Sequence, residues 1–174
     1  MELISVERRS ELLRTARSIR KMELRDNYSI DAEIFAAWRE GRSIAATAKG
    51  MADRAAERIA AGVVTHRVKV VSEPLSSYHK FILAASEPMI KAGEVMRWLP
   101  RRLASTVFLP GNDFFVLDGE AVIFNVFDGE DQRAEIQLTQ DPAVVDRCTA
   151  AFTSAWELAL PYDEYRADSR AGRV

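Results

Sequence analysis

The chain of 174 residues contains one cysteine, Cys148, and only two histidines. A single cysteine excludes an internal disulfide framework and any metal site built on several cysteines. No apolar run approaches the roughly 20 residues that a membrane-spanning helix needs. No signal-peptide core follows Met1, so we expect a cytoplasmic protein without a membrane partner.

The chain also lacks a large excess of charge of either sign, because its net charge is −2. Overall charge therefore gives no reason to expect nucleic-acid binding. Of the 24 basic residues only 5 are lysine. The excess of arginine and alanine is typical of a GC-rich genome, and it also fits a surface that binds phosphate or carboxylate groups. Residues 1–71 carry net charge +4 and residues 72–174 carry −6, which suits one internal interface or two binding surfaces.

The hydrophobic pattern predicts a helical first third. Apolar residues at three- and four-residue spacing indicate helices over about residues 5–24, 29–40 and 43–61. Ser29 is placed to cap the second helix, and Gly41 and Gly62 are placed to end the second and third. We therefore expect residues 1–62 to form a layer of three helices.

The period changes from 3.6 to 2 at residue 64, which predicts a β-containing core over residues 63–165. Asp118-Gly119 predicts a hairpin turn with positive φ at both positions, and Asp141-Pro142 predicts a helix start. The expected class is α/β (α+β), a single domain over residues 1–165 with a mixed or antiparallel sheet flanked by helices. We expect residues 166–174 to form a disordered tail. Expected strands cover residues 64–70, 95–99, 114–117, 121–127 and 134–138, and a further helix runs from 74 to before Pro88.

Motifs for familiar nucleophiles, nucleotide-binding loops and zinc sites are missing. We predict that His66 is a core histidine, that His79 lies on a solvated helix face, and that Cys148 is inert core. No metal or cofactor is expected.

Residues 109–125 are similar in pattern to the second half of a phospholipase D catalytic module, in which H-x-K-x-x-x-x-D leads into an apolar strand. With Asp118 as the aspartate, Asp113 occupies the lysine position and Gly111 the histidine position. An aspartate there repels phosphate where a cation would attract it. The pattern therefore predicts that phosphodiesterase activity is absent, and an ordinary Asp-Gly hairpin explains the same residues.

A second set of residues predicts a ligand pocket near strand ends. Arg97, Trp98 and Arg101 combine positive charge with an aromatic ring, which suits an anionic or aromatic ligand. We expect a facing wall in which a strand-to-helix turn and the Asp113 loop contribute side chains. The predicted ligand-binding residues are Glu73, Tyr78, Arg97, Trp98, Arg101 and Asp113. A buried Trp98 beside exposed arginines is the structural alternative.

Together these segments resemble a bacterial family catalogued as domain of unknown function 6879, over roughly residues 8 to 165. The resemblance implies a small cytoplasmic protein and a degenerate phospholipase D-like fold. It also implies genes that lie near helix-turn-helix regulators or in natural-product clusters, and it supplies no catalytic residues. His79-Lys80 departs from the family pattern. The residues that carry the resemblance are 23–28 (ELRDNY), 67–74 (RVKVVSEP), Tyr78 with Phe81, 97–101 (RWLPR), 109–114 (LPGNDF), 124–125 (FN), 127–129 (FDG) and 141–142 (DP).

The sequence is compatible with three functional hypotheses. The first is a non-catalytic module in bacterial regulation that binds a small molecule or a regulatory protein, such as a helix-turn-helix regulator. The second is an accessory enzyme of a natural-product pathway in which Asp113, Glu73 or His79 acts as acid or base. The third, direct nucleic-acid binding through the basic helices, is disfavoured because no helix-turn-helix is recognisable. A homodimer that completes the cleft is also expected.

Overall fold

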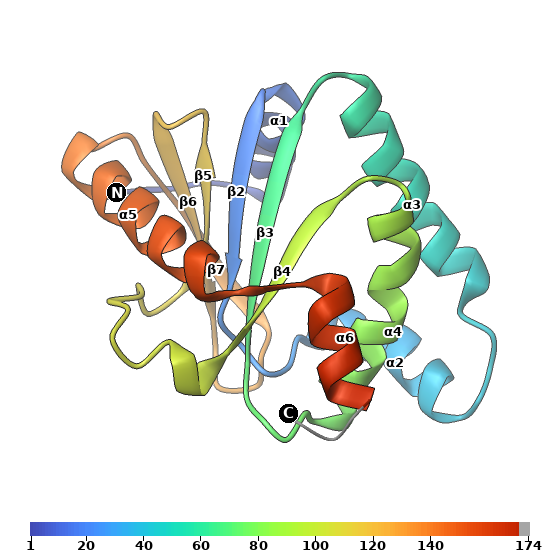
Figure 1. Ribbon diagram of the computed structural model, residues 1–174. Coiled ribbons are helices and arrows are strands. Elements are labelled where there is room, and N and C mark those ends of the chain that lie inside the picture. The colour runs from blue at the N-terminus through green and yellow to red at the C-terminus, as the bar shows by residue number, and fades with distance from the viewer. Residues whose placement is uncertain (171–174) are drawn as a thin grey trace.

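The computed structural model describes residues 1–170 and shows a mixed eight-stranded sheet with helices on both faces (Figure 1). The chain is therefore a mixed α/β protein, as predicted. The strands are β1 Glu2–Leu3, β2 Ser18–Glu23, β3 Val64–Val71, β4 Val95–Pro100, β5 Asp113–Leu117, β6 Ala121–Phe127, β7 Arg133–Thr139 and β8 Leu160–Pro161. The α-helices are α1 Val6–Thr15, α2 Ala32–Arg39, α3 Ala45–Ala60, α4 Ser77–Lys91, α5 Pro142–Leu158 and α6 Tyr162–Arg170.

The sheet has the order β1-β7-β6-β5-β2-β3-β4-β8. Strands β2, β3 and β4 are parallel neighbours, and the crossovers that join them contain α2 with α3 and then α4. The remaining pairs are antiparallel. Strand β2 lies in the middle, where the parallel part meets the antiparallel part. Both faces of this central region are covered, so charged side chains there are enclosed rather than solvated.

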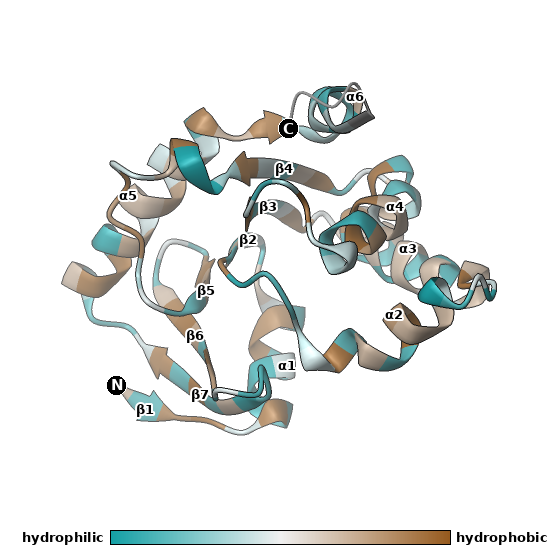
Figure 2. Cartoon of the chain, turned by 90° about the horizontal axis from the view of Figure 1, so that it is seen from below, coloured by the Kyte–Doolittle hydropathy of each residue, from teal (hydrophilic) through white to brown (hydrophobic). Residues whose placement is uncertain are grey.

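The helices divide between the two faces of the sheet. Figure 2 shows α5 on one side and α1, α2, α3 and α4 on the other. The α5 side has an apolar core that includes Met22, Val68, Phe114 and Phe152. On the opposite side, apolar clusters lie beneath α1 and beside α4 and α6. Within residues 1–170, no helix has the length and apolar character needed to cross a bilayer.

Several local predictions are confirmed. Strands β3 to β7 form where the alternation placed them, and Asp118 and Gly119 have φ values of 54° and 75°. Gly41 and Gly62 follow α2 and α3 with positive φ. The Asp141 side chain accepts a hydrogen bond from the Ala143 amide and caps α5. These features were predictable because they depend on neighbours in sequence.

The first predicted helix is wrong beyond Thr15, because Ser18–Glu23 is a strand at the centre of the sheet. Ile19 continues the helical spacing of the apolar residues before it, but in a strand Ile19 and Met22 point to opposite faces. Ile19 joins the cluster beneath α1, and Met22 joins the core beneath α5. Pairing with both β3 and β5 outweighs the local helical pattern. Residues 1–62 are therefore not a layer of three helices.

Two further boundaries differ from the prediction. Helix α4 runs through Pro88, because Met89 and Ile90 pack against the cluster beneath it and hold the last turn in place. Residues 166–170 belong to α6 rather than to a tail, since Tyr162 and Tyr165 anchor this helix in the core. The predicted tail also includes residues 171–174, which lie outside the described residues.

Candidate functional site

A cavity of about 540 Å³ lies against the sheet face that α1, α3 and α4 cover. Its floor comes from β2, β3, β5 and β6, and the segment after β2 closes one side. The charged residues that line it are seven basic and three acidic. The basic ones are Arg9, Lys21, Arg54, Arg58, Arg67, Lys69 and Arg133, and the acidic ones are Glu23, Asp31 and Asp113.

The floor contains a row of polar side chains across four neighbouring strands. Asn125 on β6 pairs with Asp113 on β5, and Glu23 on β2 pairs with Lys69 on β3. The Leu24 amide donates to Asp113 Oδ1 at 2.8 Å and joins the two halves of the row. All four side chains are buried. Burial of a polar side chain costs free energy unless the group has a hydrogen-bond or ion-pair partner. Each group of this row therefore needs a partner, either within the protein or in a bound molecule.

Glu23 forms salt bridges with two lysines, Lys21 and Lys69. Although burial by itself would raise the pKa of Glu23, the two ammonium groups hold it well below its usual range. Burial and the neighbouring Arg67 lower the pKa of Lys21 to about 8. Arg67 is paired with Glu94 at 2.6 Å. One carboxylate thus balances only one of the two lysine charges in this part of the floor.

Asp113 is held by two hydrogen bonds. Besides the Leu24 amide, the Tyr28 hydroxyl donates to Asp113 Oδ2 at 2.6 Å. Burial raises the pKa of Asp113, and the Tyr28 hydrogen bond opposes that rise. Both carboxylate oxygens therefore already accept a hydrogen bond from the protein.

Aromatic rings form the wall that faces the polar floor. The Tyr78 ring lies edge-on to Phe35 at 5.5 Å between centroids, and Phe127 contacts Tyr28 in the same way. The Tyr78 hydroxyl donates to Asp31 Oδ2 at 2.5 Å. This wall gives the cavity an apolar side opposite its charged side.

The segment after β2 is fastened by Asp131, in the turn between β6 and β7. Asp131 accepts hydrogen bonds from Arg25 and from Asn27, the latter at 3.1 Å. The Ser29 hydroxyl donates to the Asp131 carbonyl at 2.8 Å. Ser29 therefore anchors this segment and does not cap α2, which has no side-chain cap.

Several polar groups of the cavity have no salt-bridge or hydrogen-bond partner among residues 1–170. None of the described salt bridges involves Arg9, Arg54 or Arg133. Arg9 Nε is buried without an acceptor, and Asn125 Oδ1 is buried without a donor. Burial and the nearby Arg133 lower the pKa of Arg9 to about 10. A buried donor and a buried acceptor in one cavity are groups that a bound water or ligand would pair.

Only two of the six residues predicted to bind a ligand line this cavity, namely Tyr78 and Asp113. Arg97 and Trp98 are consecutive on β4, so their side chains lie on opposite faces of the sheet. Arg97 lies over the Trp156 ring of α5 at 4.3 Å from its centroid, and donates to the Trp156 carbonyl at 2.9 Å. Trp98 is fully buried and stacks on Tyr165.

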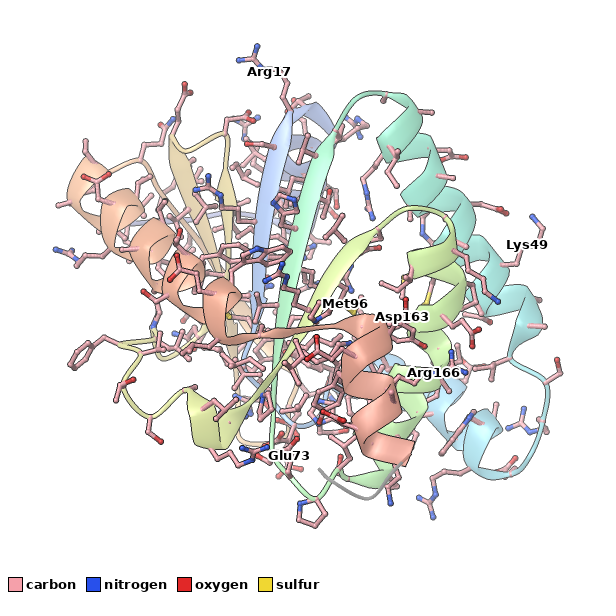
Figure 3. The ribbon with its side chains drawn as sticks, viewed as in Figure 1. Arg17, Lys49, Glu73, Met96, Asp163 and Arg166 are labelled. Atoms are coloured by element: carbon pink, nitrogen blue, oxygen red, sulfur yellow. The ribbon has the colours of Figure 1, made fainter. Side chains whose placement is uncertain are left out.

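The other two predicted residues belong to the edge where β3 and β4 end. Arg101 donates to Ser72 Oγ at 2.9 Å and to the Leu24 carbonyl at 2.7 Å. Glu73 pairs with Arg102 at 2.9 Å and accepts from the Tyr165 hydroxyl at 3.0 Å. Figure 3 shows Glu73 at the lower end of the molecule, in the loop after β3. These contacts hold loops together, so the six residues do not form one pocket.

Sequence reasoning missed the cations of the floor. Arg67 and Lys69 alternate with the apolar residues of β3, which is typical of the polar face of a half-buried strand. The signal that identifies them is a strand with helical segments before and after it, because such a strand in a parallel sheet is covered on both faces. Charged residues at alternate positions of a covered strand then point into the interior. Lys21 and Glu23 gave no such signal, since their segment was predicted to be helical.

The predictions for the two histidines and the cysteine have different outcomes. His66 is partly rather than fully buried, and its ring lies 4.8 Å from the Trp156 ring between centroids. The prediction that His79 is solvated is wrong, since this side chain is 1% exposed. It faces the Trp98 ring, its Nδ1 lies 3.5 Å from Asp26 Oδ1, and burial lowers its pKa to about 4. Cys148 is buried, as predicted. No group of three His, Cys, Asp or Glu side chains suited to a metal ion occurs within residues 1–170.

The fold and the cavity define the class, a mixed α/β protein with a cation-rich cavity on one face of its sheet. The model of the family described as "Domain of unknown function (DUF6879)" matches residues 7–167, and the chain belongs to that family. No curated protein matches the sequence.

Proposed function

We propose that this protein binds a small organic anion in the cavity beneath α1, α3 and α4, and that the binding serves regulation rather than turnover. The observation that carries the proposal is the surplus of cations, seven against three acidic groups, around the unpartnered Arg9 Nε and Asn125 Oδ1. Neighbouring cations without carboxylate partners are stabilised when an anion binds among them.

The two sides of the cavity indicate a ligand with two parts. Arginine and lysine groups suit a phosphate or carboxylate, which guanidinium groups bind with two hydrogen bonds. The aromatic wall around Tyr78 and Phe81 suits an apolar or ring-shaped part. A cavity of about 540 Å³ is large enough for a metabolite. Its floor cations Arg67 and Lys69 have side chains that are 14% and 6% exposed, so they are recessed from a surface that a duplex could contact. This recessed position favours a small molecule over nucleic acid.

The contacts of the three candidate acid–base residues favour binding over catalysis. Asp113 accepts hydrogen bonds through both oxygens, and Glu73 is occupied by Arg102 and Tyr165. His79 is packed beside Trp98 and does not line the cavity. The accessory-enzyme hypothesis would need one of these groups to be released, whereas anion binding needs none of them to move.

The phospholipase D-like ancestry stays part of the proposal. Asp118, the residue in the position of the motif aspartate, accepts hydrogen bonds from the Arg17 and Ser18 amides through Oδ1. Its contacts support a structural role in the hairpin. A regulatory partner such as a helix-turn-helix protein, and a homodimer, likewise stay proposals that follow from the family resemblance.

Thermal unfolding with defined anions tests the proposal. We expect ADP, glucose 6-phosphate or citrate to raise the Tm, while adenosine and glucose do not, because the cations select for charge. The double variant Arg54→Ala/Arg133→Ala should lose most of this rise, since both guanidinium groups line the cavity.

Two control variants locate the effect. Arg42 is exposed and paired with Glu40 outside the cavity, so Arg42→Ala should keep the full rise. Arg97→Ala should keep it as well, because Arg97 lies on the α5 side. The same rise in the Arg54→Ala/Arg133→Ala variant as in the unmodified protein, or no rise with any anion, contradicts the proposal.

A further inference from the structure

The cavity contains an amine that differs from the other lysines of the chain. Lys21 lines the cavity with 22% of its side chain exposed, whereas the side chain of Lys69 is 6% exposed. Lys49 and Lys91 lie on the surface, and each pairs with a carboxylate one helical turn away. Lys21 is thus the lysine that combines enclosure in the cavity with access from it.

The surroundings of Lys21 lower the proton affinity of its amine. Arg67 on β3 is the cross-strand neighbour of Lys21 on β2. Lys69 shares Glu23, which is the one carboxylate that forms a salt bridge with Lys21 among the described residues. With Lys21 itself protonated, these groups carry three positive charges against one negative charge, apart from Glu94, which is paired with Arg67. Burial adds to this repulsion, and the two effects lower the pKa of the amine to about 8. A lysine that is desolvated and next to other cations is activated as a nucleophile.

We infer that Lys21 captures carbonyl compounds that carry an anionic group, and that it forms a reversible imine with their aldehyde or ketone carbon. This inference rests on the proposed function, because the same cations that favour the neutral amine also bind the anion of the ligand. It narrows the ligand class from organic anions to anionic aldehydes and ketones.

The reaction balances without any further reactant. The lone pair of the Lys21 amine adds to the carbonyl carbon, and a carbon–nitrogen bond forms as the carbon–oxygen π bond opens. The two protons of the amine are transferred to that oxygen, which leaves as water, and a C=N bond remains. No oxidant or reductant is involved, and hydrolysis reverses each step. In its charged form Lys21 is hydrogen-bonded to Glu23. Because the pKa of Glu23 is held well below its usual range, this carboxylate does not retain the proton that Lys21 releases before attack, and the proton passes to solvent.

Reductive trapping on the full chain tests the inference. The probe is pyridoxal 5′-phosphate at about pH 8, near the value to which burial lowers the pKa of Lys21. Sodium borohydride fixes imines as stable amines, and peptide mass mapping reports labelling at each of the five lysines. We expect Lys21 to be labelled about tenfold or more faster than Lys49, Lys80 and Lys91. Figure 3 shows Lys49 on the outer side of α3, where it serves as the exposed reference.

Three comparisons separate labelling that depends on the cavity from labelling that depends on simple exposure. Pyridoxal, which lacks the phosphate, should label Lys21 far more slowly, while its labelling of Lys49 should stay nearly unchanged. Excess inorganic phosphate should slow labelling at Lys21 alone. The Lys21→Arg variant keeps the positive charge next to Glu23, and it should bind pyridoxal 5′-phosphate without forming the adduct.

The outcomes distinguish this inference from the proposed function. Labelling of Lys21 at the rate of Lys49, in a protein that anions still stabilise against heat, overturns the inference and leaves anion binding intact. Absence of both labelling and anion stabilisation overturns both. The comparison between lysines of the unmodified protein needs no variant, so a misfolded Lys21→Arg protein would not affect the result.

Discussion

At the scale of single residues, burial determines the protonation of groups that look ordinary in the sequence. His79 has a polar neighbour in sequence, Lys80, yet its ring is packed between α4 and Trp98. Burial and Lys69 lower its pKa, and the carboxylates of Asp26 and Glu23 raise it less. The imidazole is therefore neutral in the folded protein at physiological pH.

This neutrality predicts a pH dependence of stability. The pKa of His79 is about 4 in the folded protein and about 6.5 when unfolded, so the unfolded chain binds more protons between these values. The free energy of unfolding should therefore fall as the pH drops from about 6.5 to 4, by up to about 3 kcal/mol. Urea unfolding of the unmodified protein and of His79→Gln measures this loss, which should be smaller in the variant.

An NMR titration checks the same assignment directly. With only two histidines, the His66→Gln variant leaves one imidazole signal, that of His79. This signal should stay in its neutral position from pH 8 down to about pH 5. A midpoint near the ordinary value of histidine would contradict the assignment.

At the scale of elements, turns and hairpins follow local rules, whereas β2 depends on contacts across the sheet. Asp118 takes part in both, because it lies in the hairpin turn and its side chain contacts the start of β2. Its side-chain Oδ1 accepts from the Arg17 amide at 3.0 Å and from the Ser18 amide at 2.7 Å, and thereby fixes the start of β2. Its φ of 54° lies in the left-handed region, which aspartate and asparagine tolerate better than other side chains.

We expect Asp118→Ala to lower the free energy of unfolding by about 2–3 kcal/mol, through two lost hydrogen bonds and backbone strain. Asp118→Asn keeps one oxygen acceptor and the tolerance of positive φ, so its loss should be about 1 kcal/mol or less. Urea unfolding measures both. Glu120→Ala in the same hairpin is the control, and an equal effect from it would refute the role of Asp118 at β2.

At the scale of the whole molecule, the C-terminal helix completes the fold by covering β4. Tyr165 is fully buried, stacks on Trp98 at 5.4 Å between centroids, and donates to Glu73 Oε1 at 3.0 Å. Helix α6 is therefore part of the core, although its polar sequence suggested a tail from residue 166 onward.

Removal of this ring should destabilise the whole protein. We expect Tyr165→Ala to lower the free energy of unfolding by about 3–5 kcal/mol, because it leaves a cavity beside Trp98. Tyr165→Phe keeps the ring and loses one hydrogen bond, so about 1 kcal/mol is expected. Urea unfolding followed by tryptophan fluorescence and by circular dichroism measures both losses. A small effect of Tyr165→Ala would show that α6 is peripheral.

The sequence by itself determined the mixed α/β class, the strands from β3 to β7, the Asp118-Gly119 turn and the start of α5. Each of these depends on period, turn chemistry or capping within a few residues. It also identified Tyr78 and Asp113, which line the cavity. Its family resemblance was confirmed over residues 7–167.

Only the tertiary structure decided that residues 18–23 form the central strand. It also decided that cations from three strands (β2, β3 and β7) and two helices (α1 and α3) line one cavity. Strand pairing joins residues far apart in the chain, as between Glu23 and Lys69, and no local pattern records which strands become neighbours. Arg97 and Trp98 are the converse case, because residues that are neighbours in sequence are separated in the structure. They are adjacent in sequence, but the pleat of β4 places them on opposite faces, so they do not form one site.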